Sequence, residues 1–269
     1  MRWTSDTIAF IVALVLLTSC EKAIDPEVAK KNDDGNVEVE FRGYGSAAKV
    51  ALMAFNTDGS RALTKVKTGV PTEPLLLSLP VGDYVLVAVA HSSDVTPTLK
   101  SPQQVQFNAR DGRKLTDTYC LAMPYTVEHD QLVSVEMPLR HASACVLFSF
   151  TDDLPEGTTA LRFDYSGGSA NVNPSTLEGY TKSTQTELRP VVQPQEYAIY
   201  TFPYMAATGT LNVTVHYLDA TGADVYQRLL TNVPVTRGKV TTVSGDLQTT
   251  STSMGFTVGD WNGETTINF

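Results

Sequence analysis

The chain has 269 residues, of which 42% are hydrophobic and 18% are charged, a balance typical of a folded protein and not of a disordered chain. Its net charge of -9 gives no attraction to phosphate backbones and argues against a nucleic-acid partner. Three cysteines and four histidines leave little material for a disulfide framework or a metal site, so no cofactor is expected.

The first predicted element is an uncharged apolar run over residues 8–17. A helix that spans a bilayer needs about 20 such residues, so this run is too short to be a permanent membrane span. Its length is typical of the apolar region of a secretory signal peptide. The sequence therefore predicts an exported protein.

The run ends in Leu17, Thr18, Ser19 and Cys20, which resemble the bacterial lipobox, where small residues precede a cysteine that becomes lipidated. The alternative is an ordinary signal peptide in which a cysteine falls at this point by chance. The lipobox is favoured because the apolar run, the small residues and the cysteine follow one another at the spacing that it requires. We therefore expect residues 1–19 to be a lipoprotein signal peptide and Cys20 to carry the lipid.

Lipidation at Cys20 would anchor the mature protein to a membrane through acyl chains. In bacterial lipoproteins an aspartate directly after the cysteine favours retention in the inner membrane, and Glu21 stands there instead. The expected location is therefore the outer membrane, with the protein exposed at the cell surface. Residues 20–36 are polar and are predicted to form a flexible, lipidated tether.

Beyond residue 36 the hydrophobic pattern has a period of two, which predicts strands. The first such segment, residues 37–41, reads Val-Glu-Val-Glu-Phe. Clusters of Asn, Asp, Gly and Pro separate the segments and indicate turns, including a short turn between 75–79 and 84–90. The expected strands of this first set are 37–41, 50–55, 75–79, 84–90, 118–123 and 131–139.

A second set of strands begins after residue 140. Its expected members are 144–150, 161–165, 197–202, 211–217, 225–230, 240–243, 256–258 and 265–268, with a loop over about 166–179. No stretch of ten or more residues has convincing helical spacing. The prediction is an all-β chain with an N-terminal β-sandwich over 37–139 and a C-terminal β-sandwich over 140–269.

The sequence contains no spacing typical of a catalytic or metal site. Its histidines are scattered, and His216 lies on the polar side of its expected strand, which favours an exposed surface residue. The acidic pair at 152–153 fits a turn better than a pair of catalytic carboxylates. We expect no enzymatic activity. A hydrolase whose catalytic residues come together only in the folded chain stays an open alternative.

Cys120 and Cys145 lie in apolar surroundings, in strands assigned to different domains. An exported protein could pair them, but two buried free thiols are favoured. Trp261 is interpreted as a core aromatic of the second domain. Tyr125 and Tyr204 each follow a proline and could stack on sugars, although prolines of edge strands are the favoured explanation.

Several segments, in a fixed order, resemble one family. After the lipobox come Ala-Leu-Met-Ala-Phe-Asn-Thr-Asp-Gly at 51–59, Leu-Pro-Val-Gly-Asp-Tyr at 79–84, Asn-Val-Pro-Val-Thr-Arg-Gly-Lys-Val at 232–240 and Trp-Asn-Gly at 261–263. Together they resemble the fimbrillin-like lipoproteins of Bacteroidetes, the FimB/Mfa-type subunits of type V pili. The resemblance implies transthyretin-like sandwiches and assembly with other fimbrial subunits by donated strands.

The resemblance also implies a processing step. In this family polymerising subunits are cleaved after a basic residue, which frees a groove for a neighbour's strand, whereas anchor-type subunits keep their lipid. The strand at 37–41 is the candidate for removal here, with Lys31 and Arg42 as possible cleavage points; ordinary surface residues are the alternative for both. The chain ends six residues past Gly263, which favours an anchor, tip or accessory subunit over a stalk subunit.

The sequence thus predicts a non-enzymatic outer-membrane lipoprotein that acts as a fimbrial subunit, as anchor or accessory. Its expected partners are the membrane through Cys20, other fimbrial subunits, and host or bacterial surface ligands. The alternative is a lipid-anchored module that binds glycans or proteins. Exposed aromatic residues gathered on one loop face would favour the alternative, and a shallow groove missing a strand would favour the fimbrial subunit.

Overall fold

The computed structural model describes residues 34–107, 115–128, 132–248 and 255–261. The predicted signal peptide, Cys20, Lys31 and the predicted strand 265–268 lie outside these residues. Within them the regular structure consists of strands, which confirms the all-β class. No helix in this part of the chain is long and apolar enough to cross a membrane.

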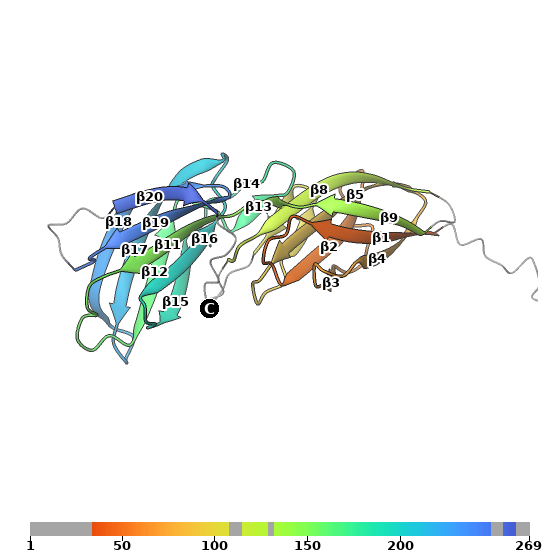
Figure 1. The fold of residues 1–269 in the computed structure, drawn as a ribbon. Coiled ribbons are helices and arrows are strands. Elements are labelled where there is room, and N and C mark those ends of the chain that lie inside the picture. Colours follow the sequence, from red (N-terminus) through yellow and green to blue (C-terminus); the bar gives the residue numbers. More distant parts are fainter. Residues whose placement is uncertain (1–33, 108–114, 129–131, 249–254, 262–269) are drawn as a thin grey trace, which may run out of the picture. The chain divides into compact units, whose positions relative to one another are not determined.

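The strands follow one another along the chain with short connections (Figure 1). The first ten are β1 (Asp34–Arg42), β2 (Lys49–Asn56), β3 (Lys67–Gly69), β4 (Leu75–Pro80), β5 (Gly82–His91), β6 (Thr98–Ser101), β7 (Gln104–Gln106), β8 (Tyr119–Val127), β9 (Leu132–Pro138) and β10 (Arg140–His141). The next ten are β11 (Ala144–Phe150), β12 (Ala160–Ser166), β13 (Asn171–Asn173), β14 (Glu178–Gly179), β15 (Gln185–Pro190), β16 (Glu196–Thr201), β17 (Thr208–Leu218), β18 (Asp224–Thr236), β19 (Lys239–Gly245) and β20 (Gly255–Asp260).

Two sheets form a first β-sandwich. One has the order β4-β1-β9 and the other β10-β8-β5-β2-β3. Their facing apolar side chains share one core cluster, in which Val39 and Leu77 from the first sheet meet Leu52 and Leu86 from the second. The alternation in the sequence produces this core, because every second side chain of a strand points to the same face.

Two further sheets form a second β-sandwich. Their orders are β16-β11-β19-β20 and β15-β12-β17-β18. Phe148 and Ile199 from one sheet pack with Phe163 and Val215 from the other in a second buried cluster. The predicted β-sandwiches are therefore confirmed, while their transthyretin-like detail stays a prediction.

A small fifth sheet has the order β14-β13-β7-β6. In it Val172 of β13 pairs with Val105 of β7, so segments from both halves of the chain meet. The loop expected over 166–179 was wrong here, since β13 and β14 fall within it. Both are too short to show alternation; β13 pairs with β7, far away in the sequence, and β14 pairs with β13. The domain boundary between residues 139 and 140 stays a prediction.

Pairing across long sequence distances sets the rest of the topology. The turn predicted between 75–79 and 84–90 exists, but it carries the chain from one sheet to another, since β4 pairs with β1 and β5 pairs with β2 and β8. β1 runs parallel to β9, and β11 runs parallel to β19. Its pairings with β4 and β9 place β1 at the centre of its sheet.

Candidate functional site

β1 contains the segment predicted to be removable, and it lies between β4 and β9. Val37, Val39 and Phe41 point into the core and are at most 5% exposed. On the opposite face Glu40 accepts a hydrogen bond from the Ser134 hydroxyl of β9 at 3.3 Å. β1 is thus bonded along both edges and covered on one face, so the place between β4 and β9 is filled.

Arg42, one of the two possible cleavage points, is the last residue of β1. Its guanidinium pairs with the Glu136 carboxylate on β9, and 68% of its side chain is exposed. Its backbone carbonyl accepts a hydrogen bond from the Leu139 amide at 2.8 Å. The Arg42 side chain is therefore open to solvent, while the carbonyl oxygen of the peptide bond that follows it is fixed by the hydrogen bond from Leu139.

Two glycines fix the path of the chain after β1. Gly43 has a φ of 69° and Gly45 a φ of 54°, values that L-residues with a side chain rarely adopt. A Cβ on Gly43 would lie 2.6 Å from the Leu139 carbonyl oxygen, and one on Gly45 would lie 2.3 Å from the Tyr119 hydroxyl. Any larger residue at either position would force neighbouring atoms to move.

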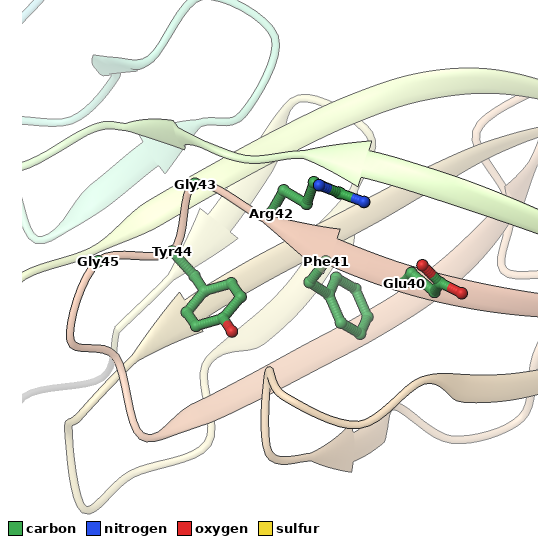
Figure 2. Close-up of a pocket in the computed structure, with 6 residues that line it drawn as sticks. All are labelled: Glu40, Phe41, Arg42, Gly43, Tyr44 and Gly45. Carbon is green, nitrogen blue, oxygen red and sulfur yellow. The ribbon is translucent and has the colours of Figure 1, made fainter.

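A shallow pocket of about 520 Å³ lies at this end of β1. Glu40, Phe41, Arg42, Gly43, Tyr44 and Gly45 line it. Figure 2 shows the Glu40 and Arg42 side chains on one side of the chain and those of Phe41 and Tyr44 on the other. Because these groups diverge, the six lining residues do not form a cage for a metal ion or cofactor.

The position of β1 gives the two possible cleavage points opposite consequences. β1 begins at Asp34, so a cut after Lys31 would leave the strand in its sheet. A cut after Arg42 would separate β1 from the rest of the chain. Loss of β1 would leave a groove between β4 and β9 and uncover core residues such as Leu77 and Met137, both 0% exposed in the intact protein.

A polar cluster that the sequence did not predict lies near β10. The His141 Nε2 atom is 2.6 Å from Asp117 Oδ1 and 3.3 Å from the Ser143 hydroxyl. The Tyr119 hydroxyl donates to Asp117 Oδ2 at 2.8 Å. Burial and the adjacent Asp117 carboxylate raise the pKa of Tyr119. The sequence carries no signal for this group, because its members are joined only by the pairing of β10 with β8.

This cluster contains the residue types of a catalytic triad but not its geometry. In a triad the serine and the carboxylate bind different nitrogens of the histidine, whereas Asp117 and Ser143 both approach Nε2 of His141. Ser143 is also 0% exposed, so a substrate could not reach its hydroxyl. The arrangement orders the local fold and does not perform nucleophilic chemistry.

Cys120 and Cys145 are free and buried, as the sequence favoured. Burial raises the pKa of the Cys120 thiol to about 12 and raises that of Cys145 as well. Since the thiolate is the reactive form of cysteine, neither side chain is suited to act as a nucleophile.

The expectation that His216 is exposed was wrong. Its residue exposure is 7%; although it lies on the outer face, charged side chains surround it. Nε2 is 3.1 Å from Asp164, Nδ1 is 3.1 Å from Asp224, and Arg162 also contacts Nδ1 at 3.1 Å. The two carboxylates contact different nitrogens, and no group of His, Cys, Asp or Glu in the described residues is arranged to hold a metal ion.

Aromatic residues do not form an exposed platform in the described part of the chain. Phe256 is the one aromatic residue there among the exposed large hydrophobics. Trp261 is half-buried and packs against the core cluster shared by both halves, with ring contacts to His141 and Tyr200. It is thus a packed aromatic but, contrary to expectation, it does not belong to the core cluster of the second sandwich. The ring of Tyr204 lies under the Lys182 ammonium, 5.2 Å from its centroid.

Comparisons with known proteins show what this chain is similar to. The model of a family described as "Family of unknown function (DUF6562)" matches residues 54–268. No curated protein matches the sequence significantly. Structural neighbours include fimbrial proteins of Bacteroidetes, which confirms the predicted resemblance.

Three solved structures illustrate the similarity. A candidate adhesin from Bacteroides ovatus is 11% identical, with a TM-score of 0.50, over 73% of this chain and 82% of its own. A candidate polysaccharide-binding protein from Bacteroides thetaiotaomicron is 11% identical, with a TM-score of 0.51, over 84% and 98%. The fimbrial anchor protein Mfa2 from Porphyromonas gingivalis is 15% identical, with a TM-score of 0.46, over 84% and 97%. At these identities the first two similarities identify the fold.

Proposed function

The chain belongs to the family of unknown function DUF6562, and we propose that it is a non-enzymatic lipoprotein of the outer membrane, exposed at the cell surface, that serves as an anchor or accessory subunit of a fimbria. Cys20 carries the lipid, and sheet edges contact other subunits. The fold that it shares with a candidate adhesin supports a role in adhesion.

The observation that carries this proposal is the position of β1. Residues 21–33 connect Cys20 to β1, a length of chain that spans at most about 45 Å when fully extended. Tension between the membrane and the fimbria is then applied directly to β1. Because β1 is bonded to β4 on one edge and to β9 on the other, both sets of hydrogen bonds must yield before it leaves the sandwich.

Retention of β1 distinguishes an anchor from a polymerising subunit. With β1 in place the groove between β4 and β9 is filled, so this subunit does not accept a donated strand there. A cut after Arg42 would remove both the lipid and the strand. The alternative function, a glycan- or protein-binding module, lacks the cluster of exposed aromatic residues that would favour it among the described residues.

Membrane fractionation tests the lipid anchor. We expect a Cys20→Ser variant to leave the outer-membrane fraction, because the acyl chains can no longer be attached. Glu21→Gln keeps the cysteine and is the matched control, expected to stay in the outer membrane. Retention of Cys20→Ser in that fraction would contradict the lipid anchor.

Copurification tests the fimbrial role. The protein isolated from native membranes with a mild detergent is expected to bring fimbrial stalk subunits with it, in a small and fixed proportion. Long filaments formed by this protein alone would contradict an anchor or accessory position, and the absence of any fimbrial subunit would contradict the fimbrial role itself.

A further inference from the structure

Tension on an anchored chain enters and leaves the first sandwich at opposite ends of one pair of strands. In the proposed anchor, on which this inference rests, the pull from the membrane reaches Asp34, the first residue of β1, through residues 21–33. β9 ends at Pro138, and the chain continues from there into β10 and the second sandwich. β1 and β9 are parallel neighbours (Figure 1). The pull from the membrane therefore acts on the amino end of β1, and the opposing pull acts on the carboxyl end of β9.

The register of this pair sets the direction in which its hydrogen bonds are loaded. The first of seven residue pairs joins Asn36 to Leu132. The last joins Arg42 to Pro138, and the Leu139 amide extends the contact by donating to the Arg42 carbonyl at 2.8 Å. Since strands rise about 3.3 Å per residue, the two points of load lie roughly 25 Å apart along the strands. A molecule under tension turns until the line between these points follows the force, so the force runs along the strands.

We infer that β1 and β9 form a clamp that bears load in shear, and that holding tension is a mechanical function of the first sandwich. In shear all hydrogen bonds along a strand pair are stretched together and share the load. When two strands are instead pulled apart from the same end, the load falls on one bond at a time, and the strands separate at a lower force. Forced separation of this kind is governed by the rate of unfolding and not by the equilibrium stability.

The hydrophobic core adds a second resistance to sliding. The inward side chains of Val37, Val39 and Phe41 are at most 5% exposed, and they share a core cluster with Leu77 of β4 and Met137 of β9. A shift by one residue would turn these apolar side chains to the outer face of the sheet. β1 must therefore slide by two residues, about 7 Å, before the same side chains can meet the core again.

β4 resists sliding along the other edge of β1. The two strands are antiparallel and are paired along residues 34–39 of β1. β4 leads directly into β5, which lies between β8 and β2 in the opposite sheet. The chain therefore ties β4 to the other half of the sandwich, and β1 has to shear past a held neighbour on each side.

Single-molecule pulling in two directions tests the clamp. The mature chain, expressed without its signal peptide and therefore without lipid, carries one handle on Cys20. The second handle is attached either to Pro138→Cys, at the carboxyl end of β9, or to Leu132→Cys, at its amino end. Both positions are exposed, and the two other cysteines of the mature chain are buried. The two variants form a matched pair, since they load the same strands from opposite ends of β9.

The rupture force at equal loading rate is expected to be at least about twofold higher for Pro138→Cys, which loads the strands in shear, than for Leu132→Cys, which peels them apart. Circular dichroism checks that each variant is folded. Where one fails to fold, Arg140→Cys replaces the handle at the carboxyl end, and Glu128→Cys replaces the handle at the amino end. The Glu128 carbonyl lies against Gly35, near the start of β1.

Equal rupture forces in the two directions, or a higher force for the handle at the amino end of β9, would overturn the clamp. This measurement needs neither the lipid nor a fimbria. Failure of the proposed anchor would instead appear in membrane fractionation, so the two failures are distinguishable.

Discussion

The first and last strands that the structure describes, β1 and β20, share an alternating apolar pattern but have opposite surroundings. Each alternates large apolar residues with smaller or polar ones. The apolar side chains of β1 are at most 5% exposed, whereas Phe256 and Val258 of β20 are 39% and 46% exposed. Among the residues that the structure describes, β1 has a strand on each side and β20 pairs only with β19. The local alternation of the sequence thus predicts a strand, whereas pairing with distant strands determines whether its apolar side chains lie in the core or at an exposed edge.

The largest predicted effect comes from placing a charge on each strand in turn. Val39→Asp puts an unpaired carboxylate in the core and should lower the free energy of unfolding by roughly 4 kcal/mol or more. Val258→Asp should change it by less than about 1 kcal/mol, because water reaches the new carboxylate. Urea unfolding of both variants measures the two values, and similar losses would remove the distinction between the strands.

Acid should weaken the half of the chain that contains β1. His91 on β5 is buried, and burial, with help from the Lys49 charge, lowers its pKa to about 4. The histidine therefore favours the folded state fully above its unfolded pKa of about 6.5, and this stability is lost as the pH falls from about 6.5 to 4. The loss amounts to roughly 3 kcal/mol.

The slope of unfolding free energy against pH measures this effect. His91→Phe removes the titrating group, so its slope between pH 6.5 and pH 4 should be shallower than that of the unsubstituted protein. Carboxylates contribute equally to both proteins and cancel in the difference. Equal slopes would show that His91 is not the group responsible.

Alanine in place of glycine sharpens the comparison further. Gly43→Ala, directly after β1, introduces a Cβ near the Leu139 carbonyl at a positive φ and should cost about 1–3 kcal/mol. Gly259→Ala, within β20, meets no atom within 4 Å and should change stability by at most a few tenths of a kcal/mol. Thermal unfolding ranks the pair; an equal or larger loss for Gly259→Ala would contradict the account.

The smallest effect concerns the attachment of β20 to β19. Hydrogen bonding and the charge of Lys239 lower the pKa of Asp260, so this pair supports the strand above the ordinary pKa of aspartate and weakens as the pH falls below it. Asp260→Asn should speed amide hydrogen exchange in β19 and β20 without shifting global unfolding. A shift in the global transition would mean that β20 is part of the core.

The alternation of the sequence predicted most of the long strands, including 37–41 and 211–217, because it reports which face of a strand meets the core. It could not predict the parallel pairing of β1 with β9, since nothing local encodes a partner almost one hundred residues away. β13 was missed for the same reason, and β14, which pairs with β13, is too short to show alternation.

The polar groups show a related limit. His216 was assigned to the correct face, but Asp164 and Asp224 cover it from neighbouring strands. The contacts of His141 with Asp117 and Ser143 also arise only from pairing between strands. Arg42 could be found from the sequence because it follows the alternating segment directly, whereas the hydrogen bond that holds its carbonyl could not.

Mass spectrometry of the N-terminal peptide from native membranes tests the central proposal most directly. The account predicts that the mature chain starts at an acylated Cys20 and continues unbroken through Arg42, so that the lipid and β1 belong to one molecule. A chain that starts at Asn32 or Gly43 would have lost its lipid, and a start at Gly43 would also have lost β1. Either start as the main species would contradict the anchor.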